Sequence, residues 1–282
     1  MVLYQNQPNL TLNWHFINAC NMQCKFCFAN KGSSSFNHNY DSFLEKCATI
    51  FTRINFVGGE PTLFKKLPYL VAKAQSLGME TSIVTNGYEA IKGNNLKELL
   101  QTFSKMKTVG ISIDSLDSAI NKKIGRQVNG YVLTQSELLA FCKTIRDMGV
   151  ELKINTVVNS FNKNEDFNFF IKEANPNRWK IFQVLPVGKK EVDDEFCISN
   201  SEYNEFRIRH EKLSTSIFTE DNDLMIDSYI MVNAKGYFIG TAPYEIKPTQ
   251  KSLYENDSNI IDELEEMNYN ISKYNLRYEN VS

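Results

Sequence analysis

The stretch LTLNWHFINACNMQCKFC, residues 10–27, places a predicted strand directly before three closely spaced cysteines. Residues 10–18 alternate polar and apolar side chains, which is typical of a β-strand with one buried face. Cys20, Cys24 and Cys27 follow within eight residues. This pairing of a strand with a cluster of soft ligands is the first element of a longer alternating pattern.

Beyond this stretch the chain alternates predicted strands with predicted helices. Further strands are expected at residues 53–57, 80–85, 108–113, 151–158 and 178–185. Helices are expected at residues 41–51, 64–76, 96–103, 133–148 and 165–173. Six alternations of this kind predict an α/β fold with a parallel sheet and right-handed crossovers.

Polar groups follow several of the predicted strands. The cysteines follow the first, Gly58-Gly59-Glu60 the second, Asn86 the third and Asp114 the fourth. In parallel sheets, chemistry collects at the carboxyl ends of the strands. We therefore expect a functional site at this end of the sheet. After residue 186 the alternation stops, with a helix expected at 201–213 and a short hairpin at 227–232 and 237–240.

Composition restricts the functional class. The 282 residues carry 31 Lys and Arg against 33 Asp and Glu, a net charge of −2. A general nucleic-acid binder would be strongly basic, so no nucleic-acid partner is expected. No run of eighteen apolar residues and no secretory signal is present, so we expect a cytoplasmic protein without a membrane anchor.

The cysteine spacing favours an iron–sulfur cluster. Three thiolates on one loop can bind three irons of a [4Fe–4S] cube and leave the fourth iron open to a cofactor or substrate. The alternative is structural zinc, which would need a fourth ligand from His15 or His38. The remaining cysteines are expected to be buried small apolar residues, and these are Cys47, Cys142 and Cys197.

Two motifs resemble one superfamily. CNMQCKFC at residues 20–27 resembles the signature of radical S-adenosylmethionine (SAM) enzymes, and GGEP at residues 58–61 resembles their motif for the amino group of SAM. Shorter segments resemble the viperin family within it. They are FANK at 28–31, INFVGGEP at 54–61, IGR at 124–126, KINTVVN at 153–159, NPNRWKIFQ at 175–183 and DSY at 227–229.

The resemblance implies a prokaryotic viperin homologue, a 3′-deoxy-3′,4′-didehydro nucleotide synthase. Its fold would be a partial (β/α)6 radical SAM barrel over residues 1–186, with an extension over 187–282 that covers the barrel and the nucleotide site. Its activity would be the dehydration of CTP, UTP or GTP to a chain-terminating analogue through a 5′-deoxyadenosyl radical, in defence against phage. An electron donor of the flavodoxin or ferredoxin type is implied.

The resemblance also assigns residues to ligands. Cys20, Cys24 and Cys27 would bind the cluster, with Lys153 as a further catalytic residue. The SAM site would comprise Gly58, Gly59, Glu60, Asn86, Ser112 and Arg126. The nucleotide site would comprise Lys31, Arg53, Lys153, Asn155, Arg178, Lys180, Tyr229 and Arg277.

Strand periodicity supports a local cationic site in this net acidic chain. Lys153 and Asn155 lie two apart and share one face of their strand, while Arg178 and Lys180 share another. Charges inside a barrel are costly unless a partner compensates them, and a bound triphosphate would be that partner.

Two other functions remain open. A radical SAM enzyme that modifies a peptide or another small molecule often carries extra cysteines near its C-terminus, whereas only Cys197 lies beyond residue 186 here. A zinc-stabilised interaction protein without enzymatic activity would bind zinc and contain no acid-labile sulfide.

Overall fold

The computed structural model describes residues 10–29, 39–186, 195–213, 215–240, 248–267 and 269–279, with the backbone alone for 277–279. All six strands predicted from the sequence are present. They are β1 (Thr11–Ile17), β2 (Arg53–Gly58), β3 (Glu80–Thr85), β4 (Thr108–Ser112), β5 (Glu151–Val158) and β6 (Arg178–Gln183). Each pairs in parallel with its sequence neighbours, as the alternation predicts.

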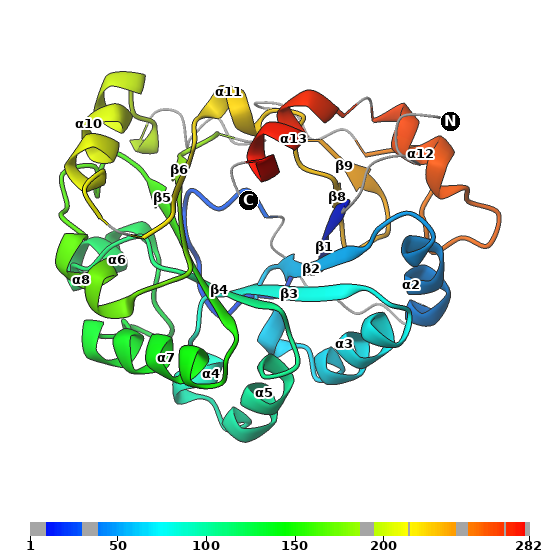
Figure 1. Cartoon of the computed structure of the whole chain (residues 1–282), viewed down its shortest axis with the longest axis horizontal. Coiled ribbons are helices and arrows are strands. Elements are labelled where there is room, and N and C mark those ends of the chain that lie inside the picture. The colour runs from blue at the N-terminus through cyan, green and yellow to red at the C-terminus, as the bar shows by residue number, and fades with distance from the viewer. Residues whose placement is uncertain are drawn as a thin grey trace.

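The predicted helices are confirmed, with ends that differ by a few residues. They are α2 (Tyr40–Ala48), α3 (Leu67–Ser76), α5 (Leu96–Phe103), α7 (Gln135–Asp147), α8 (Asn168–Ala174) and α10 (Asn200–His210). Three short elements were not predicted, namely the 3-10 turn η1 (Pro61–Leu63) and the helices α4 (Glu89–Lys92) and α6 (Ser118–Ile124). The helices line the convex side of a curved sheet (Figure 1).

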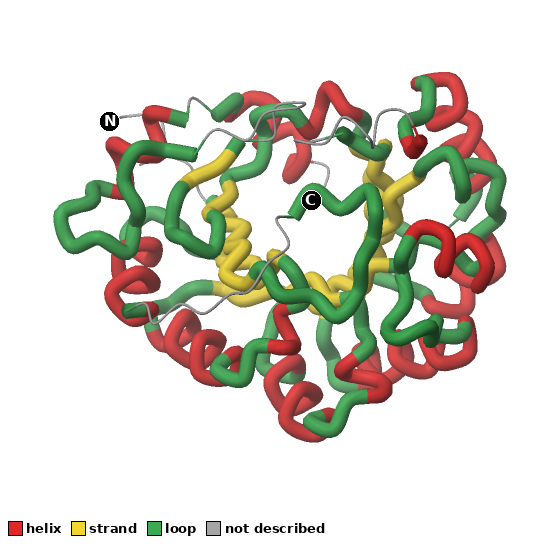
Figure 2. The backbone as a smooth tube through the Cα atoms, turned by 180° about the vertical axis from the view of Figure 1, so that it is seen from behind, coloured by secondary structure: helices red, strands yellow, loops and turns green. Residues whose placement is uncertain are grey.

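The C-terminal third adds to the same sheet. β7 (Ile217–Glu220), which the sequence did not predict, pairs in parallel with β6. β8 (Met231–Val232) and β9 (Phe238–Ile239) form the expected hairpin, with strands shorter than predicted, and β8 also pairs in parallel with β1. The described strands form one curved sheet in the linear order β7-β6-β5-β4-β3-β2-β1-β8-β9 (Figure 2). It is an open, partial barrel.

Three helices in this region also escaped the sequence analysis. They are α11 (Asn222–Met225), α12 (Ile260–Glu266) and α13 (Ile271–Glu279). In Figure 1, α13 lies on the side of the curved sheet opposite β3 and β4. Among the described residues, no helix combines the length and the apolar character needed to span a membrane.

The two faces of the sheet differ in polarity. The outer face packs against the helices through large apolar side chains, such as Trp14 of β1, which stacks on Phe43 of α2 at 4.5 Å between ring centroids. The inner face carries amides and hydroxyls. Asn55 donates to Asn13 at 3.0 Å, and Ser82 donates to Asn55 at 3.0 Å. Buried polar groups linked in this way stabilise a polar interior.

The loop after β1 is attached to two neighbouring segments by backbone hydrogen bonds. At the end of β2, the Gly59 amide donates to the Ile17 carbonyl at 2.6 Å and the Glu60 amide to the Ala19 carbonyl at 2.8 Å. At the end of α6, the Gln23 amide donates to the Gly125 carbonyl at 3.1 Å. The loop is therefore held on both sides.

Both attachment points require glycine. A Cβ atom on Gly59 would lie 2.1 Å from the Ala19 carbonyl oxygen, and one on Gly125 would lie 2.1 Å from the Gln23 carbonyl oxygen. Gly125 also has a φ of +83°, the left-handed conformation that ends α6. An added side chain would push the cysteine loop away from the sheet.

Phe26 anchors the same loop in a second apolar cluster. It is buried and packs on Phe196 at 5.8 Å between centroids, in a cluster that includes Ile124 of α6 and Val184 after β6. The cysteines therefore lie between this small apolar cluster and the polar interior of the partial barrel, which we call the chamber.

We expect Gly125→Ala to lower the free energy of unfolding by about 2–4 kcal/mol, because backbone strain of about 1 kcal/mol adds to a steric clash of about 1–3 kcal/mol. Gly130→Ala is the matched control. Gly130 has the same left-handed φ of +84°, but no atom lies within 4 Å of an added Cβ. Urea unfolding of both variants measures the difference, and equal losses would contradict the clash.

Candidate active site

The three cysteines share one electrostatic environment. Burial raises the pKa of the Cys24 thiol to about 12, an effect that the charge of Arg126 opposes. Burial also raises the pKa of Cys20, with Glu60 and Cys27 among the charges that add to the shift. Without a bound cation the Cys20 and Cys24 thiols stay protonated at neutral pH. A metal centre would supply the positive charge that deprotonates them.

The thiols suit a multi-iron cluster. Among the described residues, no group of three or more His, Cys, Asp or Glu side chains lies close enough to hold a single metal ion. In a [4Fe–4S] cube each thiolate binds a different iron, so its ligands need not converge on one point. The short turn in which the Cys27 amide donates to the Cys24 carbonyl at 3.3 Å presents its thiols from one loop, as such a cube requires.

A pocket beside this loop brings together three of the predicted SAM residues. Its lining includes Met22, Asn86, Ser112 and Arg126. The Asn121 side-chain oxygen also faces this group of residues, is buried, and has no hydrogen-bond partner among the described residues. Apolar side chains complete the walls, namely Ile113, Val132, Leu133 and Leu138.

This lining fits a nucleoside-bearing cofactor. A purine ring needs apolar walls, and a ribose or amino acid end needs a few placed polar groups. The Asn121 oxygen is an acceptor that no described residue satisfies, which is costly unless a ligand or water donates to it. A larger hollow of about 360 Å³ lies between α10 and β7, but none of the predicted site residues lines it.

The carboxylate of Glu60 accepts several hydrogen bonds from within the protein. Its carboxylate accepts from the Thr62 amide at 3.1 Å, the Thr85 hydroxyl at 2.6 Å and the Asn86 amide at 2.8 Å. Burial raises its pKa, and these donors oppose the shift. Glu60 therefore joins the ends of β2 and β3 and positions Asn86, in addition to any contact with a SAM amino group.

Asn86 in turn reaches the cysteine loop. Its side chain donates to the Asn21 side-chain oxygen at 2.8 Å, and Asn21 donates to Glu89 of α4 at 3.1 Å. A chain of hydrogen bonds therefore runs from Glu60 through Asn86 into the loop between the first two cysteines. This chain couples the position of the thiols to the ends of two strands.

Arg126 is held by an acidic partner after β4. Its Nε donates to Asp114 at 2.6 Å, its Nη2 pairs with the same carboxylate, and its Nη1 donates to the Ser112 carbonyl at 3.1 Å. Burial opposes the charge of Arg126, but the carboxylate of Asp114 outweighs this effect and raises the pKa of Arg126. Arg126 thus places a fixed positive charge between the pocket and the cysteine loop.

The inner face of β5 and β6 carries four of the predicted nucleotide residues. The structure corrects the expectation that they lie on two different faces. Lys153 pairs with Arg178 and Asn155 with Lys180 in the register of the two strands. Cross-strand partners in parallel strands point to the same side. The four residues therefore occupy one face and not two. We name these four residues the cationic wall.

Several observations show that the cationic wall faces the chamber. Trp179, between Arg178 and Lys180, points outward to Phe167, Phe206 and His210. The side chain of Lys153 lies over Gly110 of β4, where an added Cβ would be 3.0 Å from its Cε. The Asn155 side-chain oxygen is buried without a hydrogen-bond partner among the described residues.

A buried acidic residue modifies this wall. Lys180, 8% exposed, forms an ion pair with Glu220 of β7, which is 2% exposed. Tyr229, a predicted substrate residue, accepts from the Lys180 ammonium at 3.0 Å and donates to Glu220. The guanidinium of Arg178 lies 4.6 Å from the centre of the Phe218 ring of β7. β7 therefore contributes residues to this site that the sequence did not predict.

The other predicted substrate residues are less tightly grouped. Arg53 lies at the start of β2, far along the strand from Gly58, and pairs with Glu80 at 3.3 Å. Lys31 falls outside the described residues, and so does the side chain of Arg277 in α13. Lys273 of α13, another candidate cation, pairs with Asp223 of α11 at 3.0 Å.

Sequence reasoning missed four polar residues of this region. They are Asn13, Asn55, Asn121 and Glu220. Strand alternation carried a signal for the two on β1 and β2, because Asn13 and Asn55 stand at polar positions between large apolar neighbours. Nothing in the local sequence marked Glu220, since its role depends on pairing with Lys180 across two strands.

Comparison with known proteins identifies the same superfamily and family that the sequence motifs resemble. The model of the radical SAM superfamily matches residues 14–174. An S-adenosylmethionine-dependent nucleotide dehydratase of Flammeovirga pacifica is 38% identical over 94% of this chain and 92% of its own length. A protein of the same name from Psychrobacter lutiphocae is 31% identical over 97% of this chain and 96% of its own length.

Solved structures agree on the fold. Streptococcus suis SuiB bound to S-adenosylmethionine superposes with a TM-score of 0.67 at 18% identity, over 95% of this chain and 68% of that one. The enzyme anSMEcpe with bound AdoMet gives 0.67 at 16% identity, over 96% and 82%. The matched domain and the extent of sequence identity show that the chain belongs to the radical SAM superfamily and, within it, to the family of S-adenosylmethionine-dependent nucleotide dehydratases.

Proposed function

We propose that this protein converts a nucleoside triphosphate, CTP, UTP or GTP, to its 3′-deoxy-3′,4′-didehydro analogue, and that this product acts in defence against phage. The observation that carries the proposal is the cationic wall of Lys153, Asn155, Arg178 and Lys180 on the inner face of the barrel. The names of the relatives support the class of reaction.

The cationic wall suits a polyphosphate. In a chain with a net charge of −2, three cations converge with one amide on adjacent strands. Arg and Lys bind phosphate oxygens through charge-assisted hydrogen bonds, and the unpaired oxygen of Asn155 accepts from a ribose or base donor. In this proposal, Glu220 holds Lys180 in position, and triphosphate oxygens share the Lys180 ammonium with it.

The cofactor end is separate from this wall. When bound, a [4Fe–4S] cluster with SAM supplies the one-electron cleavage that begins hydrogen abstraction from the substrate. Cys20, Cys24 and Cys27 would hold the cluster, and the pocket of Asn86, Ser112, Asn121 and Arg126 would hold SAM. The protein's task is to keep the nucleotide's C4′ near the cofactor and to keep water out.

The C-terminal residues complete the site in this proposal. Residues 187–282 contribute Glu220 and Tyr229, and the sheet continues from β6 into β7 without a break. We therefore treat them as a cover for the chamber that belongs to the same folding unit. Each turnover needs two electrons, one for the cleavage of SAM and one to reduce the nucleotide radical that remains after loss of water. Both would come from a flavodoxin- or ferredoxin-type donor.

The direct test is anaerobic incubation of the reduced, reconstituted enzyme with SAM and each of CTP, UTP and GTP. We expect 5′-deoxyadenosine above the level without nucleotide for at least one triphosphate, with a dehydrated nucleotide in the mass spectrum. No increase with any triphosphate would refute the proposal. Zinc bound in place of iron, without acid-labile sulfide, would favour the interaction protein instead.

Cys24→Ala should abolish turnover and reduce iron and sulfide to background, because a [4Fe–4S] cluster loses one of its three protein ligands. The circular dichroism spectrum should stay unchanged. Cys142→Ala is the control, since Cys142 is buried in α7, away from the loop. It should keep its cluster at a cost of about 1 kcal/mol in stability. Retained activity in Cys24→Ala would refute the cluster assignment.

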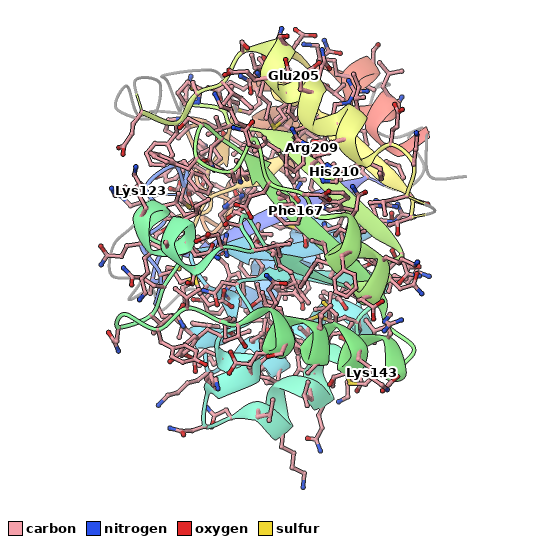
Figure 3. All side chains as sticks on the ribbon, turned by 90° about the vertical axis from the view of Figure 1, so that its left-hand side faces the viewer. Lys123, Lys143, Phe167, Glu205, Arg209 and His210 are labelled. Carbon is pink, nitrogen blue, oxygen red and sulfur yellow. The ribbon has the colours of Figure 1, made fainter. Side chains whose placement is uncertain are left out.

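Lys153→Ala should weaken triphosphate binding about 10- to 100-fold and leave SAM binding unchanged, because it removes one charged hydrogen bond to phosphate. Lys143→Ala is the control, since Lys143 lies on the exposed face of α7 and pairs only with Asp147 among the described residues (Figure 3). Isothermal titration calorimetry with both ligands measures the two affinities.

Lys180→Ala should weaken triphosphate binding in the same way and should also destabilise the fold by about 3–5 kcal/mol, because it leaves Glu220 buried without its cation. Urea unfolding separates this stability loss from the loss of affinity. An equal loss of affinity for SAM and for triphosphate would remove Lys180 from the phosphate site.

A further inference from the structure

His15 is the inner-face residue of β1 nearest to the cysteine loop that can both donate and accept a hydrogen bond. β1 alternates, so that Trp14 and Phe16 pack outward against the helices while Asn13 and His15 face the chamber. His15 pairs with Val57 of β2, and the β1–β2 register shifts directly after it. Such irregularities near the end of a strand redirect side chains.

The contacts of His15 place it next to the segment that follows Cys27. Its ring packs edge-on against Phe28, which follows Cys27, at 5.5 Å between centroids. Two residues earlier on the same face, Asn13 is fully engaged, donating to the Ile230 carbonyl at 3.2 Å and accepting from Asn55. No hydrogen bond to the imidazole of His15 is recorded among the described residues. The side chain of His15 is half-buried.

Burial lowers the pKa of His15 to about 4. The imidazole is therefore neutral at physiological pH and offers one N–H donor and one nitrogen acceptor. That pair of functions matches a hydroxyl group, which both donates and accepts. It does not match a phosphate, which only accepts and is better served by the cations of β5 and β6.

We propose that His15 hydrogen-bonds a ribose hydroxyl of the nucleotide and thereby orients the sugar beneath the cysteine loop. This inference rests on the proposed function, since the sugar must lie where its hydrogen is abstracted. The triphosphate then points toward the cationic wall on β5 and β6, and β1 contacts the ribose. His15 acts as a substrate-positioning residue that also discriminates ribose from deoxyribose.

The chain supplies its own reference for a direct test. Of its three histidines, His210 lies on the outer side of the sheet beside Phe167 (Figure 3). Its Nε2 accepts from the Phe167 amide at 2.9 Å, and its Nδ1 lies 2.7 Å from the Phe206 carbonyl. Both ring nitrogens of His210 are therefore already used, and a nucleotide in the chamber should not affect them.

The first measurement is NMR of imidazole-labelled full-length protein during titration with CTP, UTP and GTP, with signals assigned from His15→Asn and His210→Gln. We expect the His15 signals to shift with saturation and those of His210 to stay in place. If a triphosphate binds by calorimetry while the His15 signals do not move, this contact is wrong and the proposed function stands. If no triphosphate binds, the proposed function fails, and the contact fails with it.

The second measurement compares affinities of the bound triphosphate with those of its 2′-deoxy and 3′-deoxy forms. His15→Phe should weaken binding of the ribonucleotide about three- to tenfold, the loss of one neutral hydrogen bond, and His15→Asn should restore part of it. For the analogue that lacks the contacted hydroxyl, wild type and His15→Phe should bind equally. An equal loss for all three nucleotides would overturn the contact with a ribose hydroxyl.

Discussion

The site depends on the close backbone contact between the cysteine loop and two glycines. The loop after β1 lies so near to Gly59 and Gly125 that no side chain fits at either position. Hydrogen bonds from Gly59, Glu60 and Gln23 fix the loop at these contacts. These contacts fix the cysteine loop at the carboxyl ends of the strands before any metal binds. The cysteine loop, the end of β2 and the end of α6 therefore act as one rigid unit.

From this unit a hydrogen-bonded path extends into the sheet. Glu60 ties β2 to β3, Asn86 reaches from β3 to Asn21 in the loop, and Arg126 joins Asp114 after β4. Glu60 and Asp114 are almost completely buried, so each carboxylate must be compensated by these donors. The same bonds that satisfy the buried charges set the positions of the groups that line the pocket. Stability and ligand geometry therefore share one set of contacts.

Below the loop, the chamber is polar on one side and cationic on the other. β1, β2 and β3 present linked amides and a hydroxyl, while β5 and β6 present the cationic wall. In the proposed function, this asymmetry would give a bound nucleotide a direction, with its phosphates toward the cations. Glu220 reduces the net charge of the wall and keeps Lys180 ordered through a buried ion pair.

The sequence by itself determined the strand–helix order, the cysteine loop and the Gly-Gly-Glu-Pro motif after β2, because alternation, spacing and glycine position are local properties of the chain. Only the tertiary structure decided that Lys153, Asn155, Arg178 and Lys180 share one face, because strand register is set between strands. The same holds for β7, whose four residues are too short to be recognised until they pair with β6. It holds also for Glu220, whose burial becomes favourable only beside Lys180, a residue forty positions away in the sequence.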